Sequence, residues 1–355
     1  MLYMFLVMLI PMGWPIIAKI RWGNAFDWRE FTISVFVAAL ISGGVYQLGQ
    51  WSQTADTEIL NGEVTSKASE HVSCEHSYTC NCRESCSGSG KDRSCSTTCD
   101  TCYEHSYDVD WLLKNSVDSP IKIDRVDRRG TTEPPRYRAA KVGDPVAVPH
   151  WHTNYIKAVP ESLFSHAKAY AGTFQSLVPQ YPVSIYDYHY INRVLAPSLT
   201  VPDLDAWNMD VSKLLRKLGP SKQVNLVVVM AKTDDSNYQY ALQHAWLGGK
   251  KNDVVVMLGV PEYPKLSWVR VMSWTDKELF KVELRDELSE LEVVDRSVVL
   301  PIVAKHIEQS FVRKQMKDFE YLQSEISPPT WVIVLAFFLG LGSSVALSIY
   351  FSRRI

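Results

Sequence analysis

Three apolar runs in the middle of the chain predict an α/β unit. Residues 223–231 form an almost continuous apolar run rich in β-branched side chains, which is typical of a strand covered on both faces. Residues 253–260 and 266–274 form two more such runs, and residues 237–247 have the composition of a helix. A strand, a helix and a strand within about 40 residues predict a βαβ unit with a right-handed crossover.

Helical segments are predicted on either side of this unit. Residues 160–177 indicate a modest helix, and residues 184–190 indicate a strand with aromatic side chains at alternate positions. Apolar residues recur at helical spacing over three further stretches, residues 204–218, 276–291 and 295–326. We therefore expect residues 151–327 to form one α/β domain.

Three long uncharged apolar runs predict membrane-spanning helices: residues 1–18, 31–48 and 330–351. Each is near the ~20 residues that a spanning helix needs. A cleaved signal peptide is the alternative for the first run, and a buried core helix is the alternative for the third. The first run lacks a basic start and contains prolines, so we predict a membrane hairpin over residues 1–50 and a C-terminal spanning helix.

The positions of Lys and Arg predict the orientation in the membrane. Basic residues follow the first apolar run and the last one, at Lys19, Arg21, Arg29, Arg353 and Arg354. Because cytoplasmic loops carry an excess of Lys and Arg, the hairpin loop and the C-terminal tail are expected in the cytoplasm and residues 51–329 outside it. The chain has no Asn-x-Ser/Thr sequon, which favours a bacterial or phage-encoded protein of the bacterial inner membrane.

The charge balance bears on the partners. A formal net charge of −2 over 355 residues and the lack of a basic stripe argue against a nucleic-acid partner. The membrane and another envelope protein are the partners we expect. A homo-oligomer is also compatible with the sequence, because small residues between Gly340 and Ser344 would allow close contacts between helices in the membrane.

Cysteines are concentrated in one polar segment. All seven lie between residues 74 and 102, in a stretch too polar to bury a core, so cross-links are expected to hold its shape. Three disulfides with one cysteine left over are one interpretation. Two tetrahedral zinc sites are the other, which the odd count favours slightly. The zinc ligands would be Cys74, Cys80, Cys82, Cys86, Cys95, Cys99 and Cys102, with His76 or His105.

The cysteine segment sits within a predicted β-rich insert, residues 51–150. Residues 108–126 alternate apolar and polar side chains, which indicates strands joined by a turn at Asp118. His150 and His152 close the insert at alternating positions of a strand. They form either a half-exposed β pair or, less commonly, two metal ligands.

Residues 240–259 resemble the TPM domain family, in which a helix carrying Ala and Trp is followed by Gly, Asn and an apolar strand. The matching positions include Ala241, Trp246, Gly249 and Asn252, although Asp253 stands where the family usually has Gly. The resemblance, over about residues 183–310, implies a three-layer α/β sandwich that is extracytoplasmic and tethered to a membrane. It also implies phosphatase activity as one candidate function.

Two functions are compatible with these patterns. The first is a membrane-anchored interaction or regulatory module, favoured because no nucleophile–base motif, P-loop or dinucleotide-binding motif is present. The alternative is a metal-assisted phosphatase, in which carboxylates at the carboxyl ends of strands would hold Mg²⁺ or Ca²⁺. Its site would comprise Asp187, Asp234, Asp235 and Asp253. A simpler interpretation is that Asp234 and Asp235 cap a helix and Asp253 occupies a turn.

Overall fold

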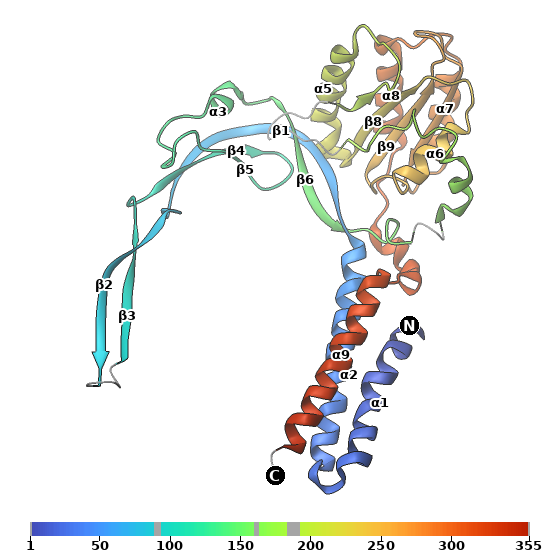
Figure 1. The fold of residues 1–355 in the computed structure, drawn as a ribbon. Helices are drawn as coiled ribbons and strands as arrows, with labels where there is room; N and C mark the ends of the chain where they lie inside the picture. Colours follow the sequence, from blue (N-terminus) through green and yellow to red (C-terminus); the bar gives the residue numbers. More distant parts are fainter. Residues whose placement is uncertain (1, 89–93, 160–162, 183–191, 354–355) are drawn as a thin grey trace.

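A computed structural model describes residues 2–88, 94–159, 163–182 and 192–353. It combines helices and strands with a cysteine-rich region, compatible with the α/β class that the sequence predicts. Figure 1 shows three parts: a bundle of long helices, a curved β arm, and an α/β domain.

The α/β domain is built on a four-stranded sheet of order β10-β9-β8-β7. β7 and β8 pair in parallel, β8 and β9 pair in parallel, and β10 pairs antiparallel with β9. The strands span Val194–Leu195 (β7), Asn225–Ala231 (β8), Asp253–Gly259 (β9) and Trp268–Ser273 (β10). Helix α6 (Tyr238–Ala245) connects β8 to β9, so the predicted strand–helix–strand unit is confirmed.

Both faces of this sheet are buried by helical segments. Alternate residues of β8 and β9 pack on one side against three helices: α5 (Leu204–Lys222), α7 (Leu279–Ser289) and α8 (Arg296–Ser310). The remaining residues of the two strands face the other side of the sheet and pack against α6. They also contact Tyr170, the last residue of η3 (Ser165–Tyr170), and Phe174 beyond it. Burial on both faces explains why β8 and β9 are continuous apolar runs rather than alternating ones.

The β arm is an antiparallel sheet of order β5-β4-β1-β6. Its strands are β1 (Ala55–Val72), β4 (Asp108–Asn115), β5 (Ile121–Ile123) and β6 (Pro145–Thr153), and a short helix, α3 (Pro135–Ala139), covers it. The 18-residue β1 pairs with β6 over its first half and with β4 over its second half, and its register shifts between Val64 and Ser66. Beyond β1 the chain continues into the hairpin of β2 (Ser77–Ser87) and β3 (Ser94–Tyr103).

The helical bundle contains α1 (Leu2–Trp22), the short η1 (Gly23–Ala25), α2 (Trp28–Thr54) and α9 (Thr330–Ser352). Within the described part of the chain, α2 and α9 are long and apolar enough to cross a membrane. The structure thus supports two of the three expected spans. α1 is not among them; it contains Pro11 and Pro15 and carries Lys19 and Arg21 in its last turn.

Several local predictions differ from the structure. The helix expected over residues 295–326 is interrupted: α8 ends at Ser310, and a 3₁₀ segment, η4, covers Met316–Glu325. The interruption places Val312 beside Thr275, whose hydroxyl donates to the Val312 carbonyl at 2.9 Å. The predicted helix over residues 160–177 is reduced to η3 and turns in its described part. The strand predicted over residues 184–190 lies outside the described residues.

Candidate functional site

Three disulfides link the two strands of the β2–β3 hairpin: Cys80–Cys102, Cys82–Cys99 and Cys86–Cys95. The bonds are nested: the two cysteines of the innermost bond are 9 residues apart in sequence, and those of the outermost bond are 22 apart. The antiparallel register places Cys86 directly opposite Cys95. Cross-strand bonds of this kind fix the register of a hairpin that has no hydrophobic core to do so.

The disulfide alternative of the sequence analysis therefore describes six of the seven cysteines. A sulfur in a disulfide is not a thiolate, so these six do not form the seven-thiolate zinc clusters. Cys74 is the cysteine left over, and its side chain is buried.

The hairpin presents a polar, exposed surface with two aromatic side chains near its base. Tyr78 is 51% exposed and Tyr103 is 57% exposed. Figure 1 shows the hairpin at the far end of the β arm from the α/β domain. Exposed Tyr side chains on a covalently fixed scaffold are typical of protein-binding surfaces, because little conformational entropy is lost on binding.

Of the four aspartates predicted to form a divalent-ion site, the three in the described part of the chain are not brought together. Asp234 and Asp235 are exposed and follow the carboxyl end of β8, whereas Asp253 begins β9. Because β8 and β9 are parallel, these positions lie at opposite edges of the sheet, separated by roughly 20 Å for strands of this length. Asp187 lies outside the described residues. The placement of Asp253 at a carboxyl strand end was therefore wrong.

Asp235 has a local structural role. Its Oδ1 accepts a hydrogen bond from the backbone N–H of Asn237 at 2.9 Å, just before α6. The expected capping of the helix by Asp234 and Asp235 is wrong, because the N-cap of α6 is Asn237 and no side chain in the described part of the chain caps it. The Asp235 contact instead orders the turn that precedes the helix.

Asp253 organises the amino-terminal edge of the sheet. Its carboxylate accepts hydrogen bonds from the Tyr181 hydroxyl at 2.9 Å, from Asn225 Nδ2 at 2.9 Å and from the Lys250 backbone N–H at 2.8 Å. Burial raises the pKa of Asp253 to about 6, although these donors favour the ionised form. The side chain is 1% exposed, so it acts as a structural link rather than as a ligand for a solvent ion.

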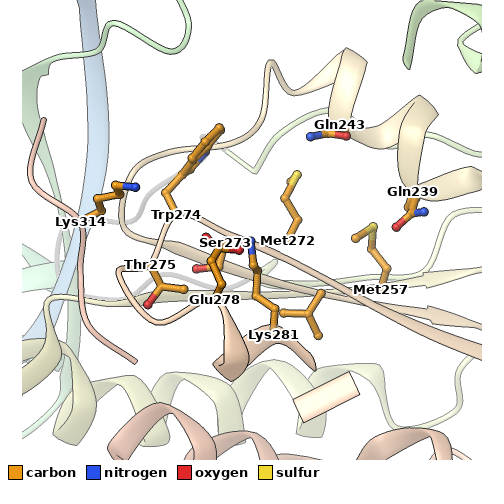
Figure 2. A pocket seen from close by; sticks show the side chains of 11 residues that line it. Gln239, Gln243, Met257, Met272, Ser273, Trp274, Thr275, Glu278, Lys281 and Lys314 are labelled. Atoms are coloured by element: carbon orange, nitrogen blue, oxygen red, sulfur yellow. Dashed lines mark ion pairs between the residues drawn. The ribbon is translucent and has the colours of Figure 1, made fainter. Parts of the chain in front are cut away.

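A cavity of about 250 Å³ lies along the outer strand β10 (Figure 2). Met257 and Met272 line its apolar part, and Lys281 of α7 and Lys314 bring positive charge to it. The residues that line it include no His, Cys or Asp. The one Ser, Ser273, donates its hydroxyl to the Asp253 carbonyl at 2.7 Å. Glu278 also lines the cavity and pairs with Lys281, so charged side chains of both signs face it.

Buried charges fasten the β arm to the α/β domain. Glu58 of β1 is fully buried; its Oε1 pairs with Arg313 and lies 3.2 Å from His150 Nδ1 and 3.8 Å from Lys251 Nζ. Burial alone would raise the pKa of Asp56, but the hydrogen bond and charge of Lys250 hold that pKa below its usual value.

His152 lies beside this cluster and is 5% exposed, whereas His150 is half-buried. Burial lowers the pKa of His152 to about 4, and neither of its ring nitrogens has a hydrogen-bond partner among the described residues. The two histidines stand two positions apart on β6, so both side chains face the same side of the strand, His150 half-buried and His152 buried.

Cys74, His105 and Asp108 meet where the β arm joins the hairpin. Cys74 Sγ lies 3.6 Å from His105 Nδ1, and Asp108 Oδ1 lies 3.3 Å from the same nitrogen. The three ligand atoms all lie within 4.8 Å of one another. Sequence reasoning had singled out Cys74 and His105 but not Asp108, which looked like one polar position in an alternating strand.

No family model, no curated protein and no solved structure matches this chain. The TPM resemblance therefore stays a prediction based on local sequence.

Proposed function

We propose that this chain is a membrane-anchored, extracytoplasmic interaction or regulatory module whose β2–β3 hairpin contacts another envelope protein. The observation that carries the proposal is the hairpin itself. It is cross-linked three times, exposed along both strands, and held at the end of a long β arm. Such rigidity lowers the entropic cost of binding, which is its main physical advantage for a segment that buries no core.

The location we propose is a bacterial inner membrane, with residues 51–329 outside the cytoplasm. α2 and α9 would cross the bilayer, with α1 packed against both. Two observations support this arrangement. Disulfides persist in oxidising compartments, and the Lys and Arg residues that flank the helices lie on the side we assign to the cytoplasm.

Helical segments cover both faces of the sheet in the α/β domain, which supports the three-layer sandwich of the proposal. The TPM-like character of that sandwich rests on the local sequence resemblance alone. The phosphatase alternative gains no comparable support. Its carboxylates at Asp234 and Asp253 stand at opposite sheet edges, so they do not form a common ion site.

Site-specific photocross-linking in native membranes tests the proposal. A photoreactive residue would replace Glu84 or Thr97, which face each other across the hairpin, or Glu283 on the exposed side of α7 as a matched control. We expect one adduct of the same mass from both hairpin positions and none from Glu283. Equal labelling at all three positions, or no adduct from the hairpin, would refute a hairpin-centred interface. An adduct of twice the chain mass would identify a second copy as the partner.

A further inference from the structure

The joint between the β arm and the hairpin contains a cluster of metal-binding side chains. Cys74 follows β1 in the turn that leads to β2, and His105 lies in the turn from β3 to β4. Asp108 is the first residue of β4 and pairs with Val72. Two turns and one strand end thus bring a sulfur, an imidazole nitrogen and a carboxylate oxygen to one point.

We propose that Cys74, His105 and Asp108 bind one zinc ion. In tetrahedral coordination with ordinary zinc–ligand bonds, sulfur and nitrogen ligands stand about 3.6 Å apart, and nitrogen and oxygen ligands about 3.3–3.4 Å apart. The observed separations are 3.6 Å between Cys74 Sγ and His105 Nδ1, and 3.3 Å between His105 Nδ1 and Asp108 Oδ1. The donor atoms are therefore already spaced as two edges of a zinc tetrahedron.

Asp108 supplies an independent observation that points to a ligand. Its side chain is fully buried, and within the part of the chain that the structure describes Oδ1 makes no hydrogen bond and has only the His105 imidazole beside it, at 3.3 Å. Its other oxygen, Oδ2, accepts from the Glu75 backbone N–H at 2.9 Å and from Arg125 Nη1 at 3.0 Å. These two donors hold the carboxylate so that Oδ1 faces the sulfur and the imidazole, as outer-shell partners do at zinc sites.

The local charges suit a divalent cation. Glu75, Asp108 and Asp110 share the two cations Arg125 and Lys122, which leaves an excess of one negative charge in this network. Zinc binding would release the thiol proton of Cys74 and pair the ion with one thiolate, one carboxylate and a neutral imidazole. The charges of the ion and its three ligands then sum to zero, which favours the burial of the site.

His76 is the natural comparison residue, because Glu75–Tyr78 and Glu104–Tyr107 carry the same four-residue sequence. Its Nε2 lies 3.1 Å from the carbonyl of Arg128, so its side chain has a different partner. Of the two histidines that the sequence offered, the geometry selects His105. The fourth coordination position would hold water, as at other three-ligand zinc sites.

A zinc ion here would lock the angle between the two β ribbons. The β1–β4 pairing ends at Val72 and Asp108, and the hairpin pairing begins at Ser77 and Tyr103. Between them, the backbone hydrogen bond from Glu104 N–H to the His76 carbonyl spans 3.0 Å. A metal bridging Cys74, His105 and Asp108 would add a cross-link at this joint. It would also protect the one remaining thiol from oxidation.

Metal analysis of the full-length chain, purified in mild detergent with its disulfides formed, tests the proposal. We expect one zinc ion per chain in the wild type and in His76→Asn, and none in Cys74→Ser or His105→Asn. Each variant is accepted only if its intact mass shows all three disulfides. Zinc-free wild-type protein, zinc retained after Cys74→Ser or His105→Asn, or equal loss from His76→Asn would each overturn the proposal.

A second measurement needs no substitution. The Cys74 thiol of the wild type is expected to react slowly with a maleimide and at least tenfold faster after a zinc chelator is added. Cobalt loaded in place of zinc should show an intense thiolate-to-cobalt absorption band. If the rate of maleimide labelling did not change on adding the chelator, and the cobalt spectrum lacked that band, the cluster would bind no metal.

Discussion

At the scale of single residues, Asp253 makes a pH-dependent contribution to stability. Burial raises the pKa of its carboxyl to about 6 in the folded chain, against about 3.9 when unfolded. Between these two values the folded chain holds a proton that the unfolded chain has lost. The contribution is thus fully present below about pH 4 and is lost as the pH rises through about 6.

We therefore expect Asp253→Asn to remove one pH-dependent term from the free energy of unfolding, of about 2–3 kcal/mol at most. Compared with the wild type, the variant should be relatively less stable at about pH 4.5 than at about pH 7. Thermal unfolding midpoints of the detergent-solubilised chain at the two pH values provide the measurement. Parallel pH profiles for both proteins would show that Asp253 keeps an ordinary pKa.

Residue identity alone did not reveal where Asp253 or Asp108 would act. Asp253 is the first residue of its apolar run, and the two strands of a βαβ unit are parallel. That order already places Asp253 at the amino end of its strand, away from Asp234, so the misplaced site was a wrong interpretation of an available signal. Asp108 occupied a polar position in an alternating pattern, which is typical of a solvent-facing side chain. Its burial depends on Arg125 and on the turn that carries Cys74, which are contacts between segments distant in sequence.

At the scale of elements, the apolar patterns predicted the strand–helix–strand core well. β8 and β9 are continuous runs because both faces are covered, and that signal is local. The length of β1 was not predictable, because residues 55–72 are polar at many positions and are held by pairing to β4 and β6. Nor could spacing decide the disulfide pairing, since six cysteines allow fifteen arrangements.

The contact between α2 and α9 depends on a glycine. A Cβ at Gly49 would lie 2.5 Å from Val332 Cγ1 and 2.9 Å from Pro328 Cβ, whereas one at Gly44 of the same helix would meet nothing within 4 Å. Gly49→Ala should destabilise the bundle by about 1–3 kcal/mol through overpacking.

Gly44→Ala, the matched control, should be neutral or slightly stabilising because Ala favours helix. Far-UV circular dichroism during heating in mild detergent measures the thermal unfolding midpoints of both variants. Equal midpoints for the two alanine variants would mean that α2 and α9 do not pack closely at Gly49.

At the scale of the whole molecule, β1 connects the three parts. It continues directly from α2, carries the β arm, and contacts the α/β domain: Asn252 Nδ2 donates to the Ile59 carbonyl at 2.8 Å, and Asn61 Nδ2 donates to the Val224 carbonyl at 3.1 Å. The position of the hairpin relative to the membrane therefore depends on how firmly β1 is held against the α/β domain.

Glu58 is the residue on which this fastening should depend most. Its buried carboxylate faces Arg313 and Lys251, so Glu58→Gln leaves both cations without their anion and should cost about 3–5 kcal/mol. Glu63, on the same strand, lies 3.9 Å from Arg216 with both side chains partly exposed, and Glu63→Gln should cost about 1 kcal/mol or less. Thermal midpoints measure the loss, and limited trypsin digestion should cut after Arg313 sooner in the Glu58 variant. If both substitutions gave the same small loss, the ion pairs of Glu58 would not be what fastens β1 to the domain.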